Sequence, residues 1–175
     1  MLKLSPTAKR LIVHWGEMGS RWGVNRTVAQ VHALLYLAPR PLDAAEIAET
    51  LSVARSNVSN SLRELQAWGI VKVTHILGDR RDHFESVTDI WELFQVILEE
   101  RWRREIEPTL QVLEVCAEEA ADDDDYTFKR VRDLQSFFTT MESWYEQVRD
   151  LGPADVKRVA RLGGKVRKLL LAGGR

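Results

Sequence analysis

Residues 54–67, ARSNVSNSLRELQA, combine a helical apolar repeat with an unusually polar opposite face. At about 3.6 residues per turn, Val58, Leu62 and Leu65 share one apolar face. Serine and asparagine are poor helix formers, so their presence on the other face indicates a requirement other than helix stability. Arginine can fork onto guanine, asparagine onto adenine, and serine can donate or accept at either base edges or phosphates. We therefore predict a DNA-reading helix with these contacts: Arg55, Ser56, Asn57, Ser59, Asn60 and Arg63.

The flanking segments complete a winged helix-turn-helix. Asp43 and Glu46 form a capping-box-like pair that opens a short helix, and residues 52–53 make a tight connection to the reading helix. Gly69 then ends the reading helix. The run IVKVTHIL, a turn at 78–82 and the run HFESV predict a β-hairpin. Two short helices joined by a tight turn and followed by a hairpin are the parts of this motif.

The hairpin tip carries two adjacent arginines, Arg80 and Arg81. A projecting wing can lay an arginine along the DNA backbone or into a narrow minor groove, where the negative potential is concentrated. The alternative is an arginine-rich turn whose charges pair with Asp79 and Asp82. The preceding helix favours the wing, and we predict that both arginines contact DNA.

The rest of the chain is expected to be helical, so the fold class is mainly α with a small β-hairpin wing. We divide the chain into an N-terminal dimerisation helix (residues 1–24), a winged helix-turn-helix (25–87) and a C-terminal helical dimerisation and effector region (88–175). Glycines at 16, 19 and 23 make the end of the first helix uncertain, and Thr27 with Gln30 predicts the capping box of the second. Pro108 should kink or break the C-terminal helix.

A heptad seam near the C-terminus predicts dimerisation. It consists of Val131, Leu134, Phe138, Met141, Tyr145 and Val148, and is widened by Phe137, Trp144 and Leu151. Packing within one chain is the alternative. A basic helix follows Gly152-Pro153; it either touches DNA phosphates or neutralises the acidic stretch 114–125, in which seven acids and no base occur.

Five stretches of the chain resemble MarR-type winged-helix regulators, and more closely their GbsR branch, the regulators of glycine-betaine synthesis and uptake. They are HWGEMGSRWGVNRTVAQVHALLYL, PLDAAEIAETL, RSNVSNSLRELQAWGIV, ILGDRRDHFE and ERWRREIEPTLQVL. The resemblance implies an intracellular homodimer that grips a pseudo-palindromic operator through Ser56, Asn57, Asn60, Arg63 and the wing arginines. Such motifs usually have serine where this chain has Ala54. We therefore expect Ser52 or Ser56 to cap the reading helix instead, or its start to be frayed.

The chain is rich in tryptophan, with six among 175 residues. Aromatic side chains can hold a quaternary ammonium group by cation–π contacts, and the GbsR resemblance makes a choline or betaine-like effector the ligand to test. The candidate cage is Trp91, Phe94, Phe137, Phe138, Trp144 and Tyr145. Ordinary packing in the core or at an interface is the simpler alternative for aromatics at helical spacing.

Composition favours a cytoplasmic DNA-binding protein and offers little for catalysis. The net charge is -1, so DNA binding must rest on local charge, as in residues 52–81 with five bases and two acids. Neither a P-loop nor a dinucleotide fingerprint is present, the four histidines fit no metal-ligand spacing, and the single cysteine excludes an intramolecular disulfide. His75 and His83 can face each other across the hairpin as a surface pair. We expect no enzyme, cofactor, metal or membrane span.

Two other classes of binding protein remain open. One is a winged-helix module that binds protein, through Trp68 and the aromatic seam. The other is a nucleoid-type DNA binder without sequence preference or effector. Specific regulation of transcription, as a repressor, is the function we expect.

Overall fold

The computed structural model describes residues 2–120, 124–152, 154–160 and 162. The chain divides into two units, residues 1–93 and residues 94–175. The first helix belongs to the same unit as the winged helix. From the sequence, residues 1–24 were expected to form a separate region. The role of this helix in dimerisation stays a prediction. Within the described residues, no helix is long and apolar enough to cross a lipid bilayer.

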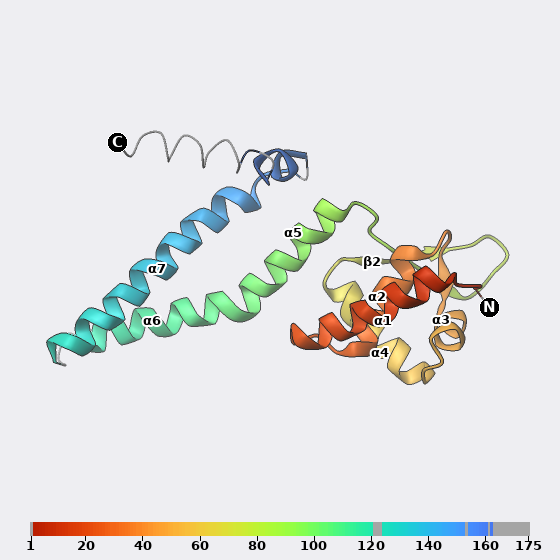
Figure 1. The fold of residues 1–175 in the computed structure, drawn as a ribbon, viewed down its shortest axis with the longest axis horizontal. Helices are drawn as coiled ribbons and strands as arrows, with labels where there is room; N and C mark the ends of the chain where they lie inside the picture. The colour runs from red at the N-terminus through yellow and green to blue at the C-terminus, as the bar shows by residue number, and fades with distance from the viewer. Residues whose placement is uncertain (1, 121–123, 153, 161, 163–175) are drawn as a thin grey trace. The chain divides into compact units, whose positions relative to one another are not determined.

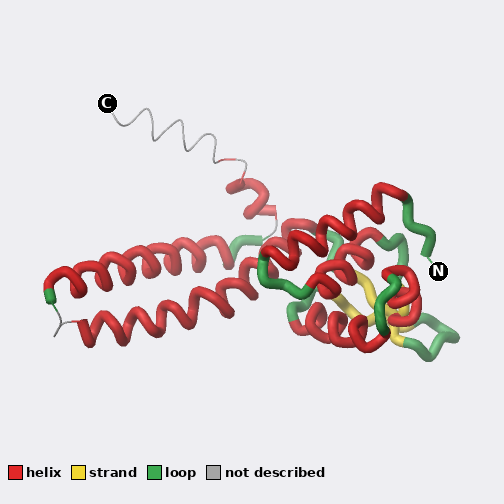
Figure 2. Tube along the Cα trace, turned by 60° about the horizontal axis from the view of Figure 1, so that its bottom comes forward, coloured by secondary structure: helices red, strands yellow, loops and turns green. Residues whose placement is uncertain are grey.

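The first unit holds the winged helix (Figures 1 and 2). Its elements are α1 (Pro6–Arg21), α2 (Arg26–Leu37), β1 (Leu42–Asp43), α3 (Ala44–Leu51), α4 (Arg55–Ala67), β2 (Val71–His75) and β3 (Asp82–Ser86). Helix α5 (Ile90–Arg101) begins in this unit and continues into the second. The second unit continues with the π-helical turn η1 (Trp102–Ile106), α6 (Glu107–Glu119) and α7 (Asp125–Arg149).

The strands form an antiparallel sheet in the order β1-β3-β2. Phe84 in β3 lies opposite Val73 of β2 on one side and Leu42 of β1 on the other. The hairpin and the mainly helical fold confirm the predicted fold class. Strand β1 was missed because it has two residues, too few for any periodic signal.

The predicted caps are partly confirmed. Asp43 caps α3, and its Oδ1 accepts hydrogen bonds from the backbone N–H groups of Ala45 at 2.7 Å and Glu46 at 2.9 Å. The predicted box at Thr27 is wrong: Asn25 caps α2, and its Oδ1 accepts from the Thr27 N–H at 2.8 Å. Asparagine is as good an N-cap as threonine or better, so the helix begins directly after Asn25, at Arg26.

Helix α1 runs through its glycines without a break. Gly16 and Gly19 are buried against α2, and a Cβ added at Gly19 would lie 2.5 Å from the Cβ of Ala29. A Cβ at Gly16 would lie 2.6 Å from the Cγ of Gln30. These glycines therefore serve the close approach of two helices, and Gly23, with φ +78°, follows the helix end.

The core of the first unit is formed by large aliphatic side chains from all its layers. The most completely buried are Val31, Leu34, Leu42, Ile47, Val58, Leu65 and Ile70. They come from α2, α3, α4 and the strand region, so one contiguous core fixes the reading helix against the rest of the winged helix.

The second unit contains the antiparallel pair α6–α7 (Figure 2). Pro108 lies in the first turn of α6, directly after the π-helical turn. Proline lacks an N–H and its ring crowds the carbonyl four residues earlier, so the wider π turn accommodates it. The expected interruption at Pro108 is thus a π-helical turn between α5 and α6.

The predicted heptad seam is divided between two faces of α7. Val131, Phe138 and Tyr145 are at least partly buried, with Tyr145 stacked on Trp102 at a centroid distance of 4.0 Å. Leu134, Phe137, Met141 and Trp144, at spacings of three, four and three, are exposed. We call this second set the α7 stripe. The seam therefore has one face that packs within the chain and one that is open in the monomer.

The basic C-terminal helix is described only in part. Residues 154–160 are helical, and Arg158 pairs with Asp155 at 2.8 Å. Arg161, Lys165, Arg167 and Lys168 lie outside the described residues, as do residues 121–123 of the acidic stretch. Both interpretations of this helix remain predictions.

Candidate nucleic-acid interface

Helix α4 has the two faces that its sequence predicts. Val58, Leu62 and Leu65 are buried in the core. The side chains predicted to contact DNA are all exposed: Arg55, Ser56, Asn57, Ser59, Asn60 and Arg63. Ser61 is buried and donates its hydroxyl to the Asn57 carbonyl at 2.8 Å, so this serine belongs to the helix interior. The polar face is thus held rigidly by the core behind it.

The N-terminus of α4 has no side-chain cap. Ala54 occupies the N-cap position, and neither of the serines expected to replace it does so. Ser52 instead closes α3 in a left-handed conformation, with φ 55°. The first-turn N–H groups of α4 are therefore left without a side-chain acceptor, an arrangement that suits a phosphate oxygen.

Two of the predicted reading residues are bonded to each other. Arg63 Nη2 donates a hydrogen bond to Asn60 Oδ1. The residues are three apart, so they lie on the same face of α4. Arg55, at the start of the same helix, makes no such bond among the described residues. The sequence placed these side chains on one face but did not show that two of them act as a pair.

Arg81 is anchored by two carboxylates. It donates Nε and Nη2 to Asp79, and Nη1 to Oδ2 of Asp43, whose side chain is only 3% exposed. The hydrogen bonds from Arg81 hold the pKa of Asp79 well below its usual value. Asp43 also caps α3, so one carboxylate ties the wing to the start of the helix-turn-helix. Pairing with Asp79 was foreseen as the alternative; the predicted partner Asp82 contacts His75 instead, at 3.8 Å.

Arg80 differs from its neighbour. It is exposed, and none of the described residues pairs with its side chain. Its charge is therefore available to a partner, whereas the charge of Arg81 is balanced internally. The two adjacent arginines at the wing tip therefore differ: one is held by carboxylates, and the other is available to bind DNA.

A cleft of about 510 Å³ lies between the N-terminus of α3, helix α4 and the wing. Arg55 and Arg63 line it from α4, and Arg81 lines it from the wing. Leu62 and Phe84 provide apolar lining. Asp43 and Asp82 also line the cleft, and Arg81 is paired with Asp43 and Asp79. Arg55 and Arg63 are therefore the lining arginines that could attract a phosphate oxygen.

The hairpin histidines do not form the surface pair. His83 lies opposite Thr74 in the register and is buried, while His75 lies opposite Asp82 and is exposed. His83 donates its Nδ1–H to the Arg81 carbonyl at 3.0 Å, and therefore supports the wing from inside. In the part of the chain that is described, no three His, Cys, Asp or Glu side chains gather as they would around a metal ion.

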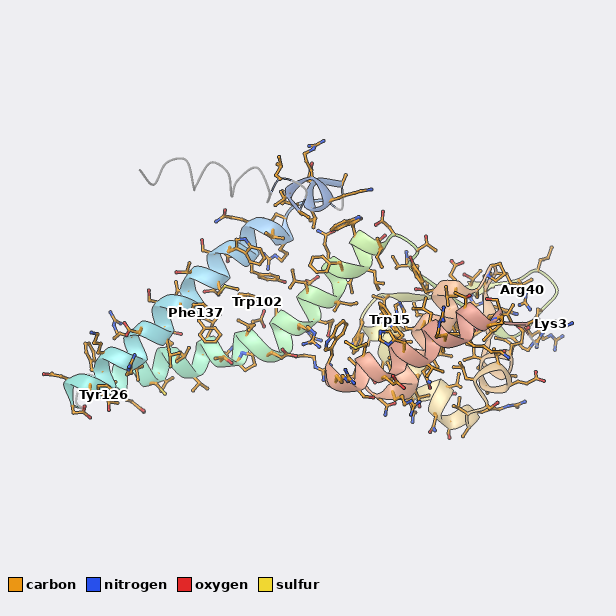
Figure 3. The ribbon with its side chains drawn as sticks, viewed as in Figure 1. Lys3, Trp15, Arg40, Trp102, Tyr126 and Phe137 are labelled. Atoms are coloured by element: carbon orange, nitrogen blue, oxygen red, sulfur yellow. The ribbon has the colours of Figure 1, made fainter. Side chains whose placement is uncertain are left out.

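The candidate effector residues differ in exposure. Tyr145 is buried by its stack on Trp102, which lies on the inner side of the helical pair in Figure 3. For Tyr145, packing is therefore the better explanation. Phe94, Phe137 and Trp144 are exposed, and Phe138 meets Phe137 edge-to-face at 5.4 Å. Trp91 is half-buried in the first unit. The cage stays a prediction.

Sequence reasoning missed a small apolar cavity of about 100 Å³ in the first unit. Trp15 of α1 (Figure 3), His32 and Tyr36 of α2, and Leu93 of α5 are among its lining residues. His32 is 4% exposed, and its Nε2 has no hydrogen-bond partner in the described chain. Burial lowers the pKa of His32 to about 4, so the ring is neutral near pH 7.

Residues 22–82 match the family model described as the MarR family. The match covers 61 of the 175 residues, so the winged-helix part of the chain is similar to the MarR family. The match spans α2 to the start of β3 and confirms the sequence resemblance to MarR proteins. The finer resemblance to the GbsR branch stays a prediction.

One solved structure has a similar fold, and others match more weakly. A crystal structure of a transcriptional regulator superposes with a TM-score of 0.65 at 19% identity, covering 82% of this chain and 96% of that one. A regulator from Thermotoga maritima has a TM-score of 0.39 at 18% identity, covering 78% of this chain and 89% of its own. A MepR mutant from Staphylococcus aureus, bound to an oligodeoxyribonucleotide, also has 0.39 at 18%, covering 81% and 98%. No curated protein matches the sequence significantly.

Proposed function

We propose that the chain is a cytoplasmic, non-enzymatic repressor that binds a pseudo-palindromic operator as a homodimer. The observation that carries this proposal is the exposed polar face of α4, which is held by a buried aliphatic face. Beside it, the wing carries Arg80, which has no partner among the described residues. MarR-type winged helices are compatible with this use of α4 and the wing. The cleft between the two elements, lined by Arg55, is where the DNA backbone would pass.

Base reading and phosphate binding are assigned to different side chains. Ser56, Asn57, Ser59, Asn60 and Arg63 face the major groove, where base edges differ in donors and acceptors. Arg55 and Arg80 contact phosphates, since both are exposed and unpaired among the described residues. Arg81 positions the wing through Asp43 and Asp79, which balance its charge.

This division can be measured by salt titration. Removing one phosphate contact lowers the slope of log affinity against log salt by about one. Arg80→Met should therefore flatten the slope and weaken all sequences alike. Arg81→Met should weaken binding more, because it leaves the buried Asp43 carboxylate without its cation and releases the wing. If both variants bind with the wild-type slope, the wing does not contact DNA.

The α7 stripe supports the homodimer. Two copies of a stripe with heptad spacing can bury each other around a two-fold axis, and an operator reader needs a second recognition helix about 34 Å away. Leu134, Phe137, Met141 and Trp144 are the residues that a second copy would cover. Sedimentation at micromolar concentration should give a dimer; a folded, full-length monomer would contradict it.

A quaternary ammonium effector of the choline or betaine class is proposed to alter DNA affinity. The support is the density of exposed aromatics in the second unit and the GbsR resemblance. Titration with choline should change tryptophan fluorescence saturably and shift operator affinity by the reciprocal factor. A neutral isostere separates cation–π binding from apolar filling. Absence of both changes would remove the effector and leave the DNA-binding proposal intact.

The direct test of the function is selection of bound duplexes from a random library, followed by a transcription assay on the selected sequence. We expect a two-fold symmetric consensus and lower transcription when the protein is added. Binding without any sequence preference would indicate a nucleoid-type protein. Failure to bind any duplex would indicate a protein-binding module, for which Trp68 and the α7 stripe are the surfaces to test.

A further inference from the structure

Asn60 and Arg63 are bonded to each other, so together they present only hydrogen-bond donors. An asparagine that is not bonded to a neighbour would present an acceptor as well. Asn60 Oδ1 is bonded to Arg63 Nη2. Arginine has no acceptor, so the atom of Asn60 that faces it must be the oxygen. The side-chain NH₂ of Asn60 is therefore the group that points away from the pair.

Reading adenine requires both ends of an asparagine amide. The Oδ1 must accept from the adenine N6 amino group while the NH₂ donates to N7. In this chain the oxygen already accepts from a guanidinium. A carbonyl oxygen has a second lone pair, but the positive charge beside it repels another donor hydrogen. The pair therefore disfavours adenine and, for the same reason, the N4 amino group of cytosine.

The bases that suit the pair are those whose edges accept. Guanine presents two acceptors, N7 and O6, in the major groove, whereas thymine presents O4 alone beside its methyl group, so guanine can pair with more of the donors. Arg63 keeps four of its five N–H donors after bonding to Asn60, and the Asn60 NH₂ adds two more. Taken separately, the arginine would read guanine and the asparagine would read adenine. Bonded together, they form one surface of hydrogen-bond donors.

We propose that Asn60 and Arg63 form a single guanine-selective reading unit, in which Arg63 prevents Asn60 from reading adenine. This inference rests on the proposed function, since it assumes that α4 enters the major groove. It assigns base identity to this part of the operator, which the DNA-binding proposal leaves open. It also predicts that removal of Arg63 changes specificity to a new base.

The test is selection from a random duplex library with wild type, Arg63→Met, Asn60→Ala and the double variant. Methionine keeps the length and the apolar stem of arginine but donates nothing. Both positions are exposed, so folding should persist, and circular dichroism checks it. Arg55→Met is the matched control, because Arg55 is an exposed arginine of the same helix without a bond to Asn60.

In the wild-type selection, the operator positions that depend on Asn60 or Arg63 should be guanine. Wild type should show no adenine preference that Asn60→Ala removes. Arg63→Met frees Oδ1 and should shift preference from guanine to adenine by at least about fivefold. The double variant should lose that adenine preference, and Arg55→Met should weaken binding without changing the base. A wild-type adenine preference that disappears in Asn60→Ala overturns the proposal, as does an unchanged base preference in Arg63→Met. If wild type enriches no sequence, the proposed function itself fails, and this inference with it.

Discussion

The two units bury their apolar side chains to very different extents. The first unit contains all seven of the most completely buried large side chains, from Val31 to Ile70. Among the described residues of the second unit, the buried apolar side chains are Trp102, Ala117, Ala120, Tyr145 and Val156, whereas the α7 stripe is open. The first unit therefore has a core of its own, and the second presents a face that suits a second chain. This difference suggests that stability and assembly reside in separate parts of the molecule.

The largest effect is expected from charges placed on the α7 stripe. Phe137 and Trp144 are 57% and 52% exposed in the single chain. Large aromatic anchors at an interface cost about 2 kcal/mol or more each when lost. Phe137→Asp combined with Trp144→Asp should weaken the dimer by about 4 kcal/mol, roughly a thousandfold in Kd. Sedimentation over a dilution series measures this change.

The control for the stripe places the same charges on another face of α7. Thr139→Asp combined with Gln147→Asp changes two exposed residues outside the stripe. This pair should leave the dimer constant close to wild type. Equal weakening by both pairs, or no weakening by the stripe pair, would exclude the stripe as the dimer interface.

Truncation of the core of the first unit should act on folding and not on assembly. Leu34 is fully buried in α2. Leu34→Ala removes buried methyl groups and leaves a cavity, with a typical loss of about 2–5 kcal/mol in the free energy of unfolding. Urea unfolding should show this loss, while the dimer constant measured under native conditions stays near wild type. If Leu34→Ala changed the dimer dissociation constant more than the free energy of unfolding, stability and assembly would not lie in separate units.

Acid should weaken the first unit through His32. Its pKa is about 4 in the folded chain because of burial, against 6.5 as the ordinary value. Below about pH 6.5 the unfolded chain takes up a proton that the folded chain does not, so stability falls until about pH 4. The total is about 3 kcal/mol. Unfolding of wild type and His32→Leu at pH 7 and pH 4.5 should show a smaller acid loss in the variant; parallel pH curves would refute this role of His32.

A smaller effect is expected where α1 meets α2. Gly19→Ala gains helix propensity, at most about 1 kcal/mol, but its Cβ would lie 2.5 Å from the Ala29 Cβ. Overpacking costs about 1–3 kcal/mol, so thermal unfolding should show a net loss. Glu17→Ala, an exposed change on the same helix, should remain near wild type. Equal or higher stability of Gly19→Ala would mean that the two helices can separate freely.

The fold of the winged helix was predictable because its signals are local. Asp43, Gly69 and the alternation of the hairpin each mark a boundary within a few residues of sequence. The glycines of α1 were misleading for the opposite reason. A glycine that interrupts a helix and one that permits close packing look the same until the neighbouring helix is known.

The candidate site was predictable in residue type but not in pairing. The polar face of α4 follows from helical periodicity, whereas the bond between Asn60 and Arg63 depends on side-chain rotamers. The contact of Arg81 with Asp43 joins residues 38 apart in sequence, which no local pattern reveals. Likewise, heptad spacing identified the apolar residues of α7 but could not say which face packs within the chain.

The most direct measurement compares wild-type binding to the selected duplex with binding to a shuffled duplex of the same composition, at one salt concentration near physiological. Specific DNA binders prefer their site by about a thousandfold or more. We expect wild type to prefer the selected duplex by this factor and Arg63→Met to prefer it less. The two proteins should differ less in their affinity for the shuffled duplex than in their affinity for the selected one. Equal affinity of wild type for the two duplexes would contradict sequence-specific recognition by α4.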